Sequence, residues 1–491
     1  MAKSLWQKDN YNKNLKKIDN NLKTDILIIG AGITGVTLAY NLINTKYDVI
    51  LIDRGKFYNE VTAKSTGKIN YLQNLVYQDI ESMYDFNGAK LYYESQKDAI
   101  RIIRKNIKEN SINCDIKRNI SSCFTYDEDE KEKFNKERKL LDKLGIKYES
   151  NVNLFNGAKD IITVNNCYVF NPVKYLNGLY KTLKKHNNIH MFEESLATKI
   201  KKEEDNYIVS VNNYEITCKK LVLACNYPFF TIPFLMPFKT YIEKSYICAS
   251  KVKKVKNIDG ITTGGNVISF RYDENKYFIY LNNSSKLSSK LNFNKNTLDC
   301  ENGIINMTNE KPSYKWMNMD VMTNDYIPYI GYISEDDKNC FISTGYNTWG
   351  MTNGTIGAKI IYDLIINKKD KYQKLFSIKR NVNIKKIKNL FVNTVFSNVK
   401  AYTFSLLKKN PSWYKNTYIT KLNGKRVGVY IDNDNKKHIV SNVCPHLKCF
   451  LMFNEADKTW DCPCHGSRFD IEGNVIKGPS TYNIKINESS S

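Results

Sequence analysis

The sequence predicts an α/β domain near the N-terminus and a small all-β domain near the C-terminus. Three observations predict this arrangement: the length of 491 residues, a glycine-rich turn near the N-terminus, and a cysteine–histidine cluster near the C-terminus. A chain of this length is too long for one hydrophobic core, so we expect two or three domains. A hydrophobic fraction of 42% and an aromatic fraction of 12% indicate a folded chain.

Residues 23–55 have the pattern of a βαβ unit. An apolar run at 25–29 leads directly into the glycine-rich turn 30–35, a helical pattern follows, and a second apolar run ends at Asp53. Glycines at 30, 32 and 35 permit the tight turn, the approach of a pyrophosphate and close packing of helix on strand. Asp53 follows Gly32 by 21 residues and is placed to accept hydrogen bonds from adenosine ribose hydroxyls. This unit predicts dinucleotide binding.

The dinucleotide is predicted to be FAD. Proteins that reduce a flavin with NAD(P)H usually carry a second fingerprint of this kind, and the sequence contains none. The apolar run 221–224, for example, leads into prolines rather than into a helix. We therefore expect electrons to arrive from a substrate.

Further segments resemble the D-amino acid oxidase-like superfamily of FAD-dependent oxidoreductases over roughly residues 20–370. Residues 62–67 resemble the Ser/Thr- and Gly-rich segment that passes near the pyrophosphate and flavin. Residues 196–197 resemble an adenine-contacting segment, and 222–225 the strand that returns to the FAD domain. Two late stretches are also similar to the family's, namely 325–331, in which Tyr326 replaces the usual glycine, and the Gly-rich turn at 343–345 and 350–354.

The resemblance implies an α/β FAD-binding Rossmann-type domain with an α+β substrate domain within residues 1–374. The FAD-binding core would comprise about 20–75, 190–230 and 320–374, and the substrate domain about 75–190 and 230–320. Together with the glycine fingerprint, the resemblance implies cofactor contacts from Gly30, Ala31, Gly32, Ile33, Thr34, Gly35, Asp53, Arg54, Thr62, Ala63, Lys64, Ser65, Thr66, Gly67, Ala197, Ala224, Gly345, Trp349, Gly350, Met351 and Thr352.

Two residues are candidate catalytic groups. Lys64 would lie near the flavin and act in proton transfer or orient a water, with neutralisation of a phosphate as the alternative. Arg271, in a strand-like run, would clamp a substrate carboxylate, with a surface arginine on a strand as the alternative.

Four chemistry-bearing residues form the C-terminal cluster: Cys444, His446, Cys462 and His465, in a C-x-H and C-x-x-H pattern. A zinc site is one interpretation of two cysteines and two histidines. Extra cysteines at 449 and 464, the Gly466-Ser467 pair and the following run of turns favour an iron–sulfur site instead.

These residues resemble a Rieske 2Fe–2S domain, which would span about 411–491 as a small all-β module. The resemblance implies that Cys444 and Cys462 bind one iron, that His446 and His465 bind the other, and that Cys449 and Cys464 form a disulfide. Two departures stand out: Lys448 replaces a common glycine, and Phe469 replaces a tyrosine that hydrogen-bonds the cluster in high-potential members. The second should lower the reduction potential.

The basic charge has a compositional explanation. The chain has a net charge of +24, but 65 of its 74 basic residues are lysines, and nucleic-acid readers favour arginine. The sequence also contains no nucleic-acid-binding signature, so we expect no nucleic-acid partner. No signal peptide or membrane-spanning run is evident, which predicts a cytoplasmic chain. Residues 375–410 have apolar positions at helical spacing with lysines between them, which favours a linker helix over contact with an anionic membrane.

These expectations combine into a function. The chain would oxidise a small amine or amino acid by hydride transfer to FAD and pass electrons through the cluster to an external acceptor, such as a redox protein. Two alternatives stay open: an oxygen-using amine oxidase with a regulatory cluster, and an electron-transfer flavoprotein that takes electrons from a protein partner. A Rieske oxygenase is disfavoured, since His186, His190 and His438 do not supply its mononuclear iron site.

Overall fold

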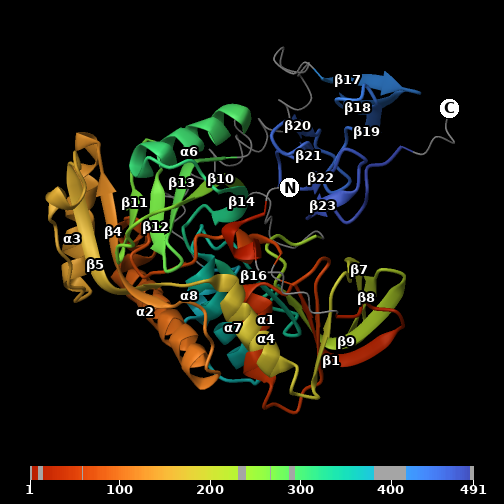
Figure 1. Cartoon of the computed structure of the whole chain (residues 1–491). Helices are drawn as coiled ribbons and strands as arrows, with labels where there is room; N and C mark the ends of the chain where they lie inside the picture. The colour runs from red at the N-terminus through yellow and green to blue at the C-terminus, as the bar shows by residue number, and fades with distance from the viewer. Residues whose placement is uncertain are drawn as a thin grey trace.

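The computed structural model describes residues 3–8, 15–57, 59–229, 239–265, 267–286, 293–380 and 416–486. They form two large sheets in the first 380 residues and two small sheets at the C-terminus (Figure 1). Most of the predicted linker, 381–410, and the first residues of the predicted C-terminal domain, 411–415, lie outside the described residues. No helix among the described residues is both long and apolar enough to cross a bilayer.

The first sheet has the order β15-β16-β9-β1-β2-β6, with the hairpin β7–β8 attached beside β9. All its neighbours from β16 to β6 are parallel, and residues 26–29 of β1 are buried, as expected for a strand covered on both faces. Its strands are β1 (Leu22–Ile29), β2 (Val49–Ile52), β6 (Ile189–Phe192), β7 (Ala197–Glu203), β8 (Asn206–Val211), β9 (Tyr214–Leu223), β15 (Tyr329–Tyr332) and β16 (Cys340–Thr344).

Three helices pack together beside this sheet, since α1 (Ile33–Leu42) contacts both α4 (Pro172–Leu183) and α7 (Gly350–Ile365). Helix α4 begins with Asn171, whose side chain accepts from two backbone N–H groups of the first turn. From Pro172 onward the chain therefore packs against α1, beside the first sheet.

The second sheet has the order β14-β10-β13-β12-β11-β4-β5-β3 and is mostly antiparallel, with only β11 and β4 parallel. Helix α6 covers β10 and β13, while α2 packs against α7 and joins the two sheets (Figure 1). Its strands are β3 (Lys68–Ile69), β4 (Lys117–Thr125), β5 (Asp160–Val169), β10 (Thr240–Lys251), β11 (Ile258–Thr262), β12 (Ser269–Asp273), β13 (Tyr277–Lys286) and β14 (Tyr314–Thr323).

The remaining helices of this part are short or lie at its outside. Helix α2 contains a kink at Asp85, where φ is +69°. The helices are α2 (Val76–Glu109), α3 (Lys131–Lys143), α6 (Phe293–Thr308), α8 (Gln373–Phe376) and the 3₁₀ turns η1 (Leu5–Lys8), η2 (Val61–Lys64), η3 (Glu128–Glu130) and η4 (Val152–Leu154).

The C-terminal domain consists of the sheets β17-β18-β19 and β20-β21-β22-β23. Its core includes Trp460, which is fully buried and leaves no room for a side chain at Gly428: a Cβ there would lie 2.4 Å from the indole. The strands are β17 (Thr417–Leu422), β18 (Lys425–Ile431), β19 (Lys437–Ser441), β20 (Met452–Asn454), β21 (Thr459–Asp461), β22 (Arg468–Phe469) and β23 (Val475–Lys477).

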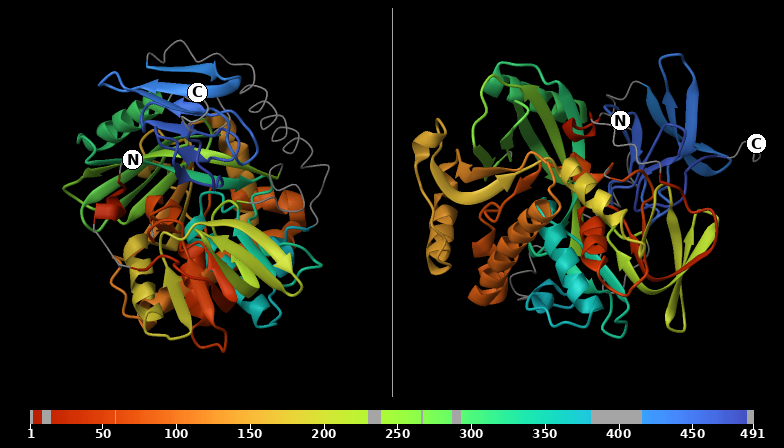
Figure 2. Two further views of the ribbon diagram at one scale, coloured as in Figure 1. Left: turned by 90° about the vertical axis from the view of Figure 1, so that its right-hand side faces the viewer. Right: turned by 60° about the horizontal axis from the view of Figure 1, so that its bottom comes forward.

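The C-terminal domain docks against β10 and β14, as both views of Figure 2 show. A fully buried ion pair joins them, with Lys244 Nζ of β10 3.3 Å from Asp461 Oδ2 of β21. The Arg54 guanidinium also donates to the Ile476 carbonyl at 2.8 Å. These contacts fix the cysteine–histidine loops against the glycine-rich core.

Candidate functional site

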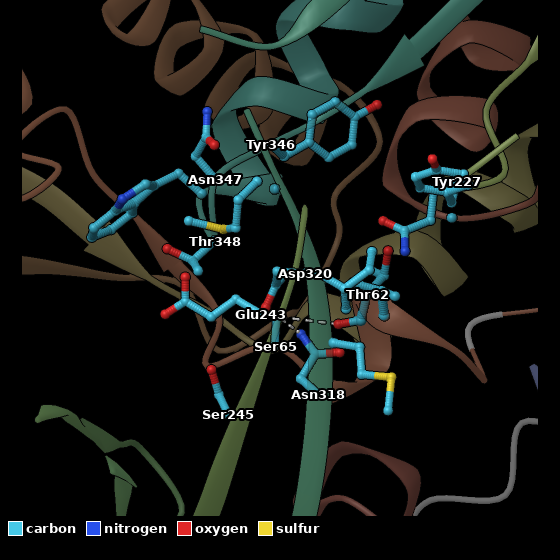
Figure 3. A pocket seen from close by; sticks show the side chains of 18 of the residues that line it. Thr62, Ser65, Tyr227, Glu243, Ser245, Asn318, Asp320, Tyr346, Asn347 and Thr348 are labelled. Atoms are coloured by element: carbon cyan, nitrogen blue, oxygen red, sulfur yellow. Dashed lines mark hydrogen bonds between the residues drawn. The ribbon is translucent and has the colours of Figure 1, made fainter. Parts of the chain in front are cut away.

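A cavity of about 640 Å³ lies where the end of β1, the face of the second sheet and the C-terminal domain meet (Figure 3). The glycine-rich core contributes residues such as Gly30 and Asp53, and β10 and β14 contribute Glu243 and Asp320. The C-terminal domain contributes His465, Gly466 and residues 477–481. One cavity therefore joins the two motifs that the sequence analysis singled out.

The turn after β1 brings backbone N–H groups to the edge of this cavity. Gly30 adopts φ of +110°, and a Cβ there would lie 2.5 Å from the Ala224 carbonyl oxygen. A Cβ on Gly35 would lie only 1.9 Å from the Gly30 carbonyl oxygen. Only glycine therefore lets α1 begin so close to β1, and its N-terminus can receive a phosphate group at the cavity.

Asp53 is held at the cavity edge by two backbone hydrogen bonds. The Ala31 N–H donates to Oδ2 at 2.9 Å, and the Gly55 N–H donates to Oδ1 at 3.0 Å. Burial raises the pKa of Asp53. Since a carboxylate has about four acceptor positions, both oxygens keep capacity for ribose hydroxyls. The site thus fits the adenosine half of a dinucleotide.

Most of the predicted cofactor contacts line this cavity: Gly30, Ala31, Gly32, Ile33, Thr34, Asp53, Arg54, Thr62, Ser65, Thr66, Gly67, Ala197, Ala224, Trp349, Gly350 and Met351. Five others lie outside its lining: Gly35, Ala63, Lys64, Gly345 and Thr352. These five support the walls instead. The Thr352 hydroxyl, for example, accepts from Gln73 Nε2 at 3.0 Å, and Gly345 adopts φ of +78° beside Thr323.

The two candidate catalytic residues are engaged elsewhere. The Lys64 ammonium lies 3.7 Å from Glu60 Oε2. The Arg271 side chain is fully buried, donates to the carbonyls of Thr66, Gly67, Phe170 and Tyr272, and pairs with Asp273 at 3.0 Å. Neither residue lines the cavity. The expected carboxylate clamp at Arg271 is therefore corrected: burial and saturation of the guanidinium make it a brace for the 66–67 segment.

The cysteine–histidine loops bring their four predicted ligands together. The Cys462 thiol hydrogen-bonds Cys444 and, with the backbone N–H groups of His446 and Leu447, lowers the pKa of Cys444. The rings of His446 and His465 are 5.1 Å apart. Burial lowers the pKa of these imidazoles to about 4 and about 3, so both are neutral at pH 7.

The donor set fits a 2Fe–2S cluster. The Nδ1 atoms of His446 and His465 are buried, and neither has a hydrogen-bond partner among the described residues. Buried polar atoms without partners are rare, and two neutral imidazole nitrogens beside two thiols match a cluster with two thiolate and two histidine ligands. The Ser467 hydroxyl hydrogen-bonds Cys444, as expected for a donor to a ligand sulfur.

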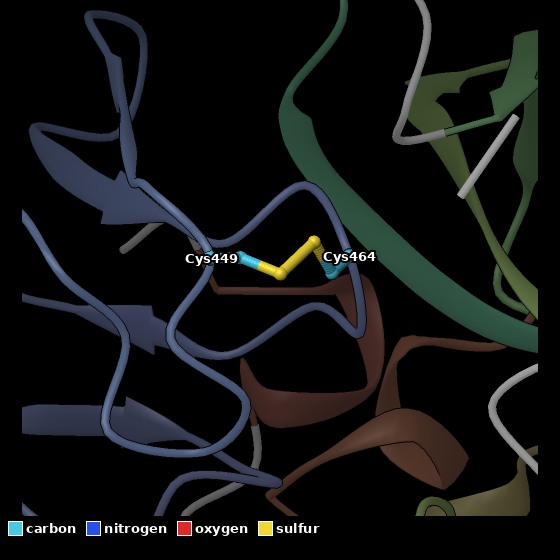
Figure 4. Close-up of a disulfide and its surroundings, with 2 residues drawn as sticks. All are labelled: Cys449 and Cys464. Carbon is cyan, nitrogen blue, oxygen red and sulfur yellow. A yellow bond between two sulfur atoms is a disulfide. The ribbon is translucent and has the colours of Figure 1, made fainter. Parts of the chain in front are cut away.

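Cys449 and Cys464 form a disulfide that bridges the two ligand loops (Figure 4). Their sulfurs lie within 4.8 Å of the Cys462 sulfur, but the disulfide leaves only Cys462 of these three able to bind a metal. Lys448, which stands where a glycine is common, adopts φ of +59°. The loop therefore keeps a left-handed conformation despite the substitution.

Residues 25–364 match the family model described as FAD dependent oxidoreductase, which covers more than half of the chain, and residues 408–488 match the Rieske 2Fe–2S domain. The chain belongs to the FAD-dependent oxidoreductase family. It is an FAD-dependent oxidoreductase with a Rieske domain, and its cofactors are FAD and a 2Fe–2S cluster.

Three known proteins are similar to this flavoprotein, one in sequence and two in structure. It is 27% identical over 503 residues to the Rieske 2Fe-2S iron-sulfur protein YhfW of Bacillus subtilis, covering 98% of this chain and 97% of that protein. The glycine oxidase structure from Geobacillus kaustophilus has a TM-score of 0.62 at 10% identity, covering 74% of this chain and all of that one. L-proline dehydrogenase from P. horikoshii has a TM-score of 0.60 at 15% identity, covering 73% and 97%. Each of these two solved structures has a fold similar to that of this chain over the part that they cover.

Sequence reasoning missed the residues of the flavoprotein that face this cavity from the second sheet. Glu243 and Ser245 of β10 and Asn318 and Asp320 of β14 all line it (Figure 3). The available signal was in β14, where the polar Asn318 and Asp320 stand at every second position with Met319 between them; in β10, Lys244 separates Glu243 from Ser245 and hides the alternation. Tyr227 was also missed, and its ring lies 5.3 Å from the His465 ring and 6.2 Å from the His446 ring.

Proposed function

We propose that this flavoprotein is a dehydrogenase that oxidises a small amine or amino acid and passes the electrons through its Rieske domain to an external acceptor. The observation that carries the proposal is the shared cavity, which is lined by both the glycine fingerprint and the ligand-loop residue His465. An oxidase that reacts with oxygen would not need a second redox domain at the wall of its flavin site.

When bound, FAD accepts two electrons with the hydrogen of a substrate C–H bond, and a 2Fe–2S cluster transfers electrons singly. The residues of the chain position and enclose these groups. The N-terminus of α7, at Gly350 and Met351, faces the cavity and favours negative charge there. Tyr227 lines the cavity and packs against the rings of both histidine ligands, and only 7% of its surface is exposed. We propose Cys444, His446, Cys462 and His465 as the cluster ligands.

The external acceptor belongs to the same proposal. A net charge of +24 favours an acidic redox protein, because complementary charge accelerates encounter. Its reduction should slow as salt is raised, since exposed charges are screened. A small-molecule acceptor without charge would show no such dependence.

Anaerobic stopped-flow absorbance tests the order of electron transfer. We expect an amine or amino acid to bleach the flavin first and the cluster absorbance to change afterwards. The variant Cys462→Ser, supplied with saturating FAD, should retain flavin bleaching and lose the second phase. Reduction of the flavin only by a protein donor would support the electron-transfer alternative and contradict the dehydrogenase. A dithionite-reduced sample without an iron–sulfur EPR signal and with stoichiometric zinc would contradict the cluster.

A further inference from the structure

The cavity face of the second sheet carries a set of polar side chains in fixed register. Strands β10 and β14 are antiparallel, with Glu243 opposite Asp320 and Ser245 opposite Asn318. Because alternate residues of a strand point to the same side, these four share one face. All four line the cavity, and Figure 3 shows them grouped on neighbouring strands.

Asn318 contributes a hydrogen-bond acceptor without a partner, its side-chain oxygen, to this face of the sheet. Only 5% of its surface is exposed, and its Nδ2 donates to Asp320 Oδ2 at 3.2 Å. Its Oδ1 is buried and has no hydrogen-bond partner among the described residues. A buried acceptor without a partner costs about 1–3 kcal/mol, so a ligand that donates to Oδ1 would remove this penalty.

Asp320 adds a carboxyl group to the same face, and burial raises its pKa to about 7, so it carries negative charge above that pH. Among the described residues, Lys477 acts on this carboxyl group through its charge and not through a hydrogen bond. The neighbouring Lys477 donates instead to the Met319 carbonyl at 3.4 Å. With Glu243 opposite, this face offers carboxylate and amide oxygens to a ligand, a set that suits a cation with several N–H donors.

The cationic side chains that line the cavity are poor partners for a substrate carboxylate. The guanidinium of Arg54 is bound to Ile476 and Glu60, and the Lys68 ammonium contacts Gly260, Ser269 and Asp259. Burial lowers the pKa of Lys477 to about 7, so this lysine is only partly charged near neutral pH. Two further lysines line the cavity, Lys56 and Lys133, and the Lys133 ammonium contacts Glu130 Oε1 at 2.6 Å. Arg54, the one arginine among the residues that line the cavity, is already engaged, so the lining offers no unoccupied bidentate fork for a carboxylate.

We propose that the substrate is a primary or secondary amine that binds as its ammonium ion, donates to Asn318 Oδ1 and the Asp320 carboxylate, and needs no carboxylate of its own. Glu243 supplies further negative charge to the same position. This inference rests on the proposed function, which names an amine or an amino acid, and it selects the amine.

The binding test uses compounds without an α C–H bond, which cannot be oxidised. We expect tert-butylammonium to perturb the spectrum of the bound flavin, whereas the uncharged tert-butanol and the anion pivalate do not. Asp320→Asn should weaken tert-butylammonium by about 30-fold or more, since it removes one partner of a buried charge pair. Asn318→Leu should weaken it less. The exposed Glu310→Gln is the matched control and should leave binding unchanged.

The turnover test compares isobutylamine with valine, which differ by one carboxylate. Faster flavin reduction by isobutylamine supports the inference, and faster reduction by valine overturns it. Absence of a tert-butylammonium response, or an unchanged response in Asp320→Asn with full FAD content, also overturns it. If tert-butylammonium binds as expected but no amine reduces the flavin, the binding site stands and the proposed dehydrogenase function fails.

Discussion

The Tyr227 ring lies 5.3 Å from the ring of His465, and both residues line the cavity that carries the glycine fingerprint. The same tyrosine is 6.2 Å from His446. A single aromatic side chain of the flavin domain therefore contacts both predicted histidine ligands of the cluster. Tyr227 therefore lies both at the cavity and against the proposed cluster ligands.

Replacing Tyr227 tests this connection. We expect Tyr227→Leu to slow electron transfer from flavin to cluster at least about tenfold, equivalent to about 1.4 kcal/mol in activation free energy. Flavin reduction by substrate should keep its rate, and Tyr227→Phe, which preserves the ring, should resemble the native protein. Stopped-flow traces at flavin and cluster wavelengths separate the two steps. Equal rates in the Leu variant and the native protein would show that the ring plays no part.

The buried charges of the domain interface give a second prediction. Asp461 accepts from Arg468 at 2.9 Å and from Thr459 at 2.7 Å, and lies 3.3 Å from Lys244. Burial acts to raise the pKa of Asp461, but the charges of Arg468 and Lys244 hold this pKa at about 2. Asp461→Ala should destabilise the Rieske domain by about 3–5 kcal/mol, because it removes the counter-charge of the buried Lys244 and one of the two carboxylates that pair with Arg468.

Lys244→Met is the control for that change. Burial lowers the pKa of Lys244 to about 8, which indicates a poorly compensated charge. Its replacement by an apolar side chain of similar length should leave the unfolding midpoint of the Rieske domain almost unchanged, because Arg468 still pairs with Asp461. Thermal unfolding followed at the cluster absorbance measures both variants. A similar loss in both would assign the effect to docking rather than to the domain itself.

The disulfide gives a prediction for stability. Cys449 and Cys464 are separated by 15 residues, and closing a loop of that length contributes about 3 kcal/mol. The double variant Cys449→Ala/Cys464→Ala should lower the free energy of unfolding of the Rieske domain by that amount. Denaturant unfolding with and without a thiol reductant measures it. Reductant should weaken the native protein and leave the double variant unaffected.

The close contact between Gly35 and the Gly30 carbonyl predicts the effect of a side-chain carbon at position 35. Because a Cβ would lie 1.9 Å from the Gly30 carbonyl oxygen, Gly35→Ala should displace α1 and abolish FAD retention. Gly55→Ala provides the comparison, since its Cβ would meet Asp53 Oδ1 at an ordinary 3.9 Å. The flavin-to-protein absorbance ratio after purification reports the difference. Full FAD content in Gly35→Ala would contradict the close packing.

Ammonium binding should depend on pH. Burial raises the pKa of Asp320 to about 7, with Glu243 raising it further and Lys477 opposing. Asp320 is therefore protonated and neutral below about pH 7 and becomes a carboxylate above it. Lys477 loses its proton over the same range, which also favours a bound cation. The affinity for tert-butylammonium should rise between pH 6 and pH 8, and Asp320→Asn should flatten this rise. A fall in the affinity between pH 6 and pH 8 would contradict the assignment of Asp320 as a partner of the ammonium ion.

Local patterns made the cofactor motifs predictable, whereas the cavity depends on strand pairing. The contact of Gly35 with Gly30 and those between the cysteine–histidine loops join residues close in the sequence, so their spacing alone carries the information. Asn318 and Asp320 acquire their meaning only from their partners on β10, more than seventy residues away along the chain. Arg271 was misassigned for the same reason: its strand lies inside the sheet, where its charge is enclosed by backbone carbonyls.

The shared wall of the cavity couples cofactor loading to domain assembly. A ligand that fills the space between Gly30 and residues 477–481 touches both domains at once, so its binding free energy also holds the domains together. Such coupling is reciprocal: the factor by which FAD strengthens docking of the Rieske domain equals the factor by which docking strengthens FAD binding. Loss of iron or reduction of the disulfide would therefore be felt at the flavin, and a chain with a damaged cluster would tend to release its FAD.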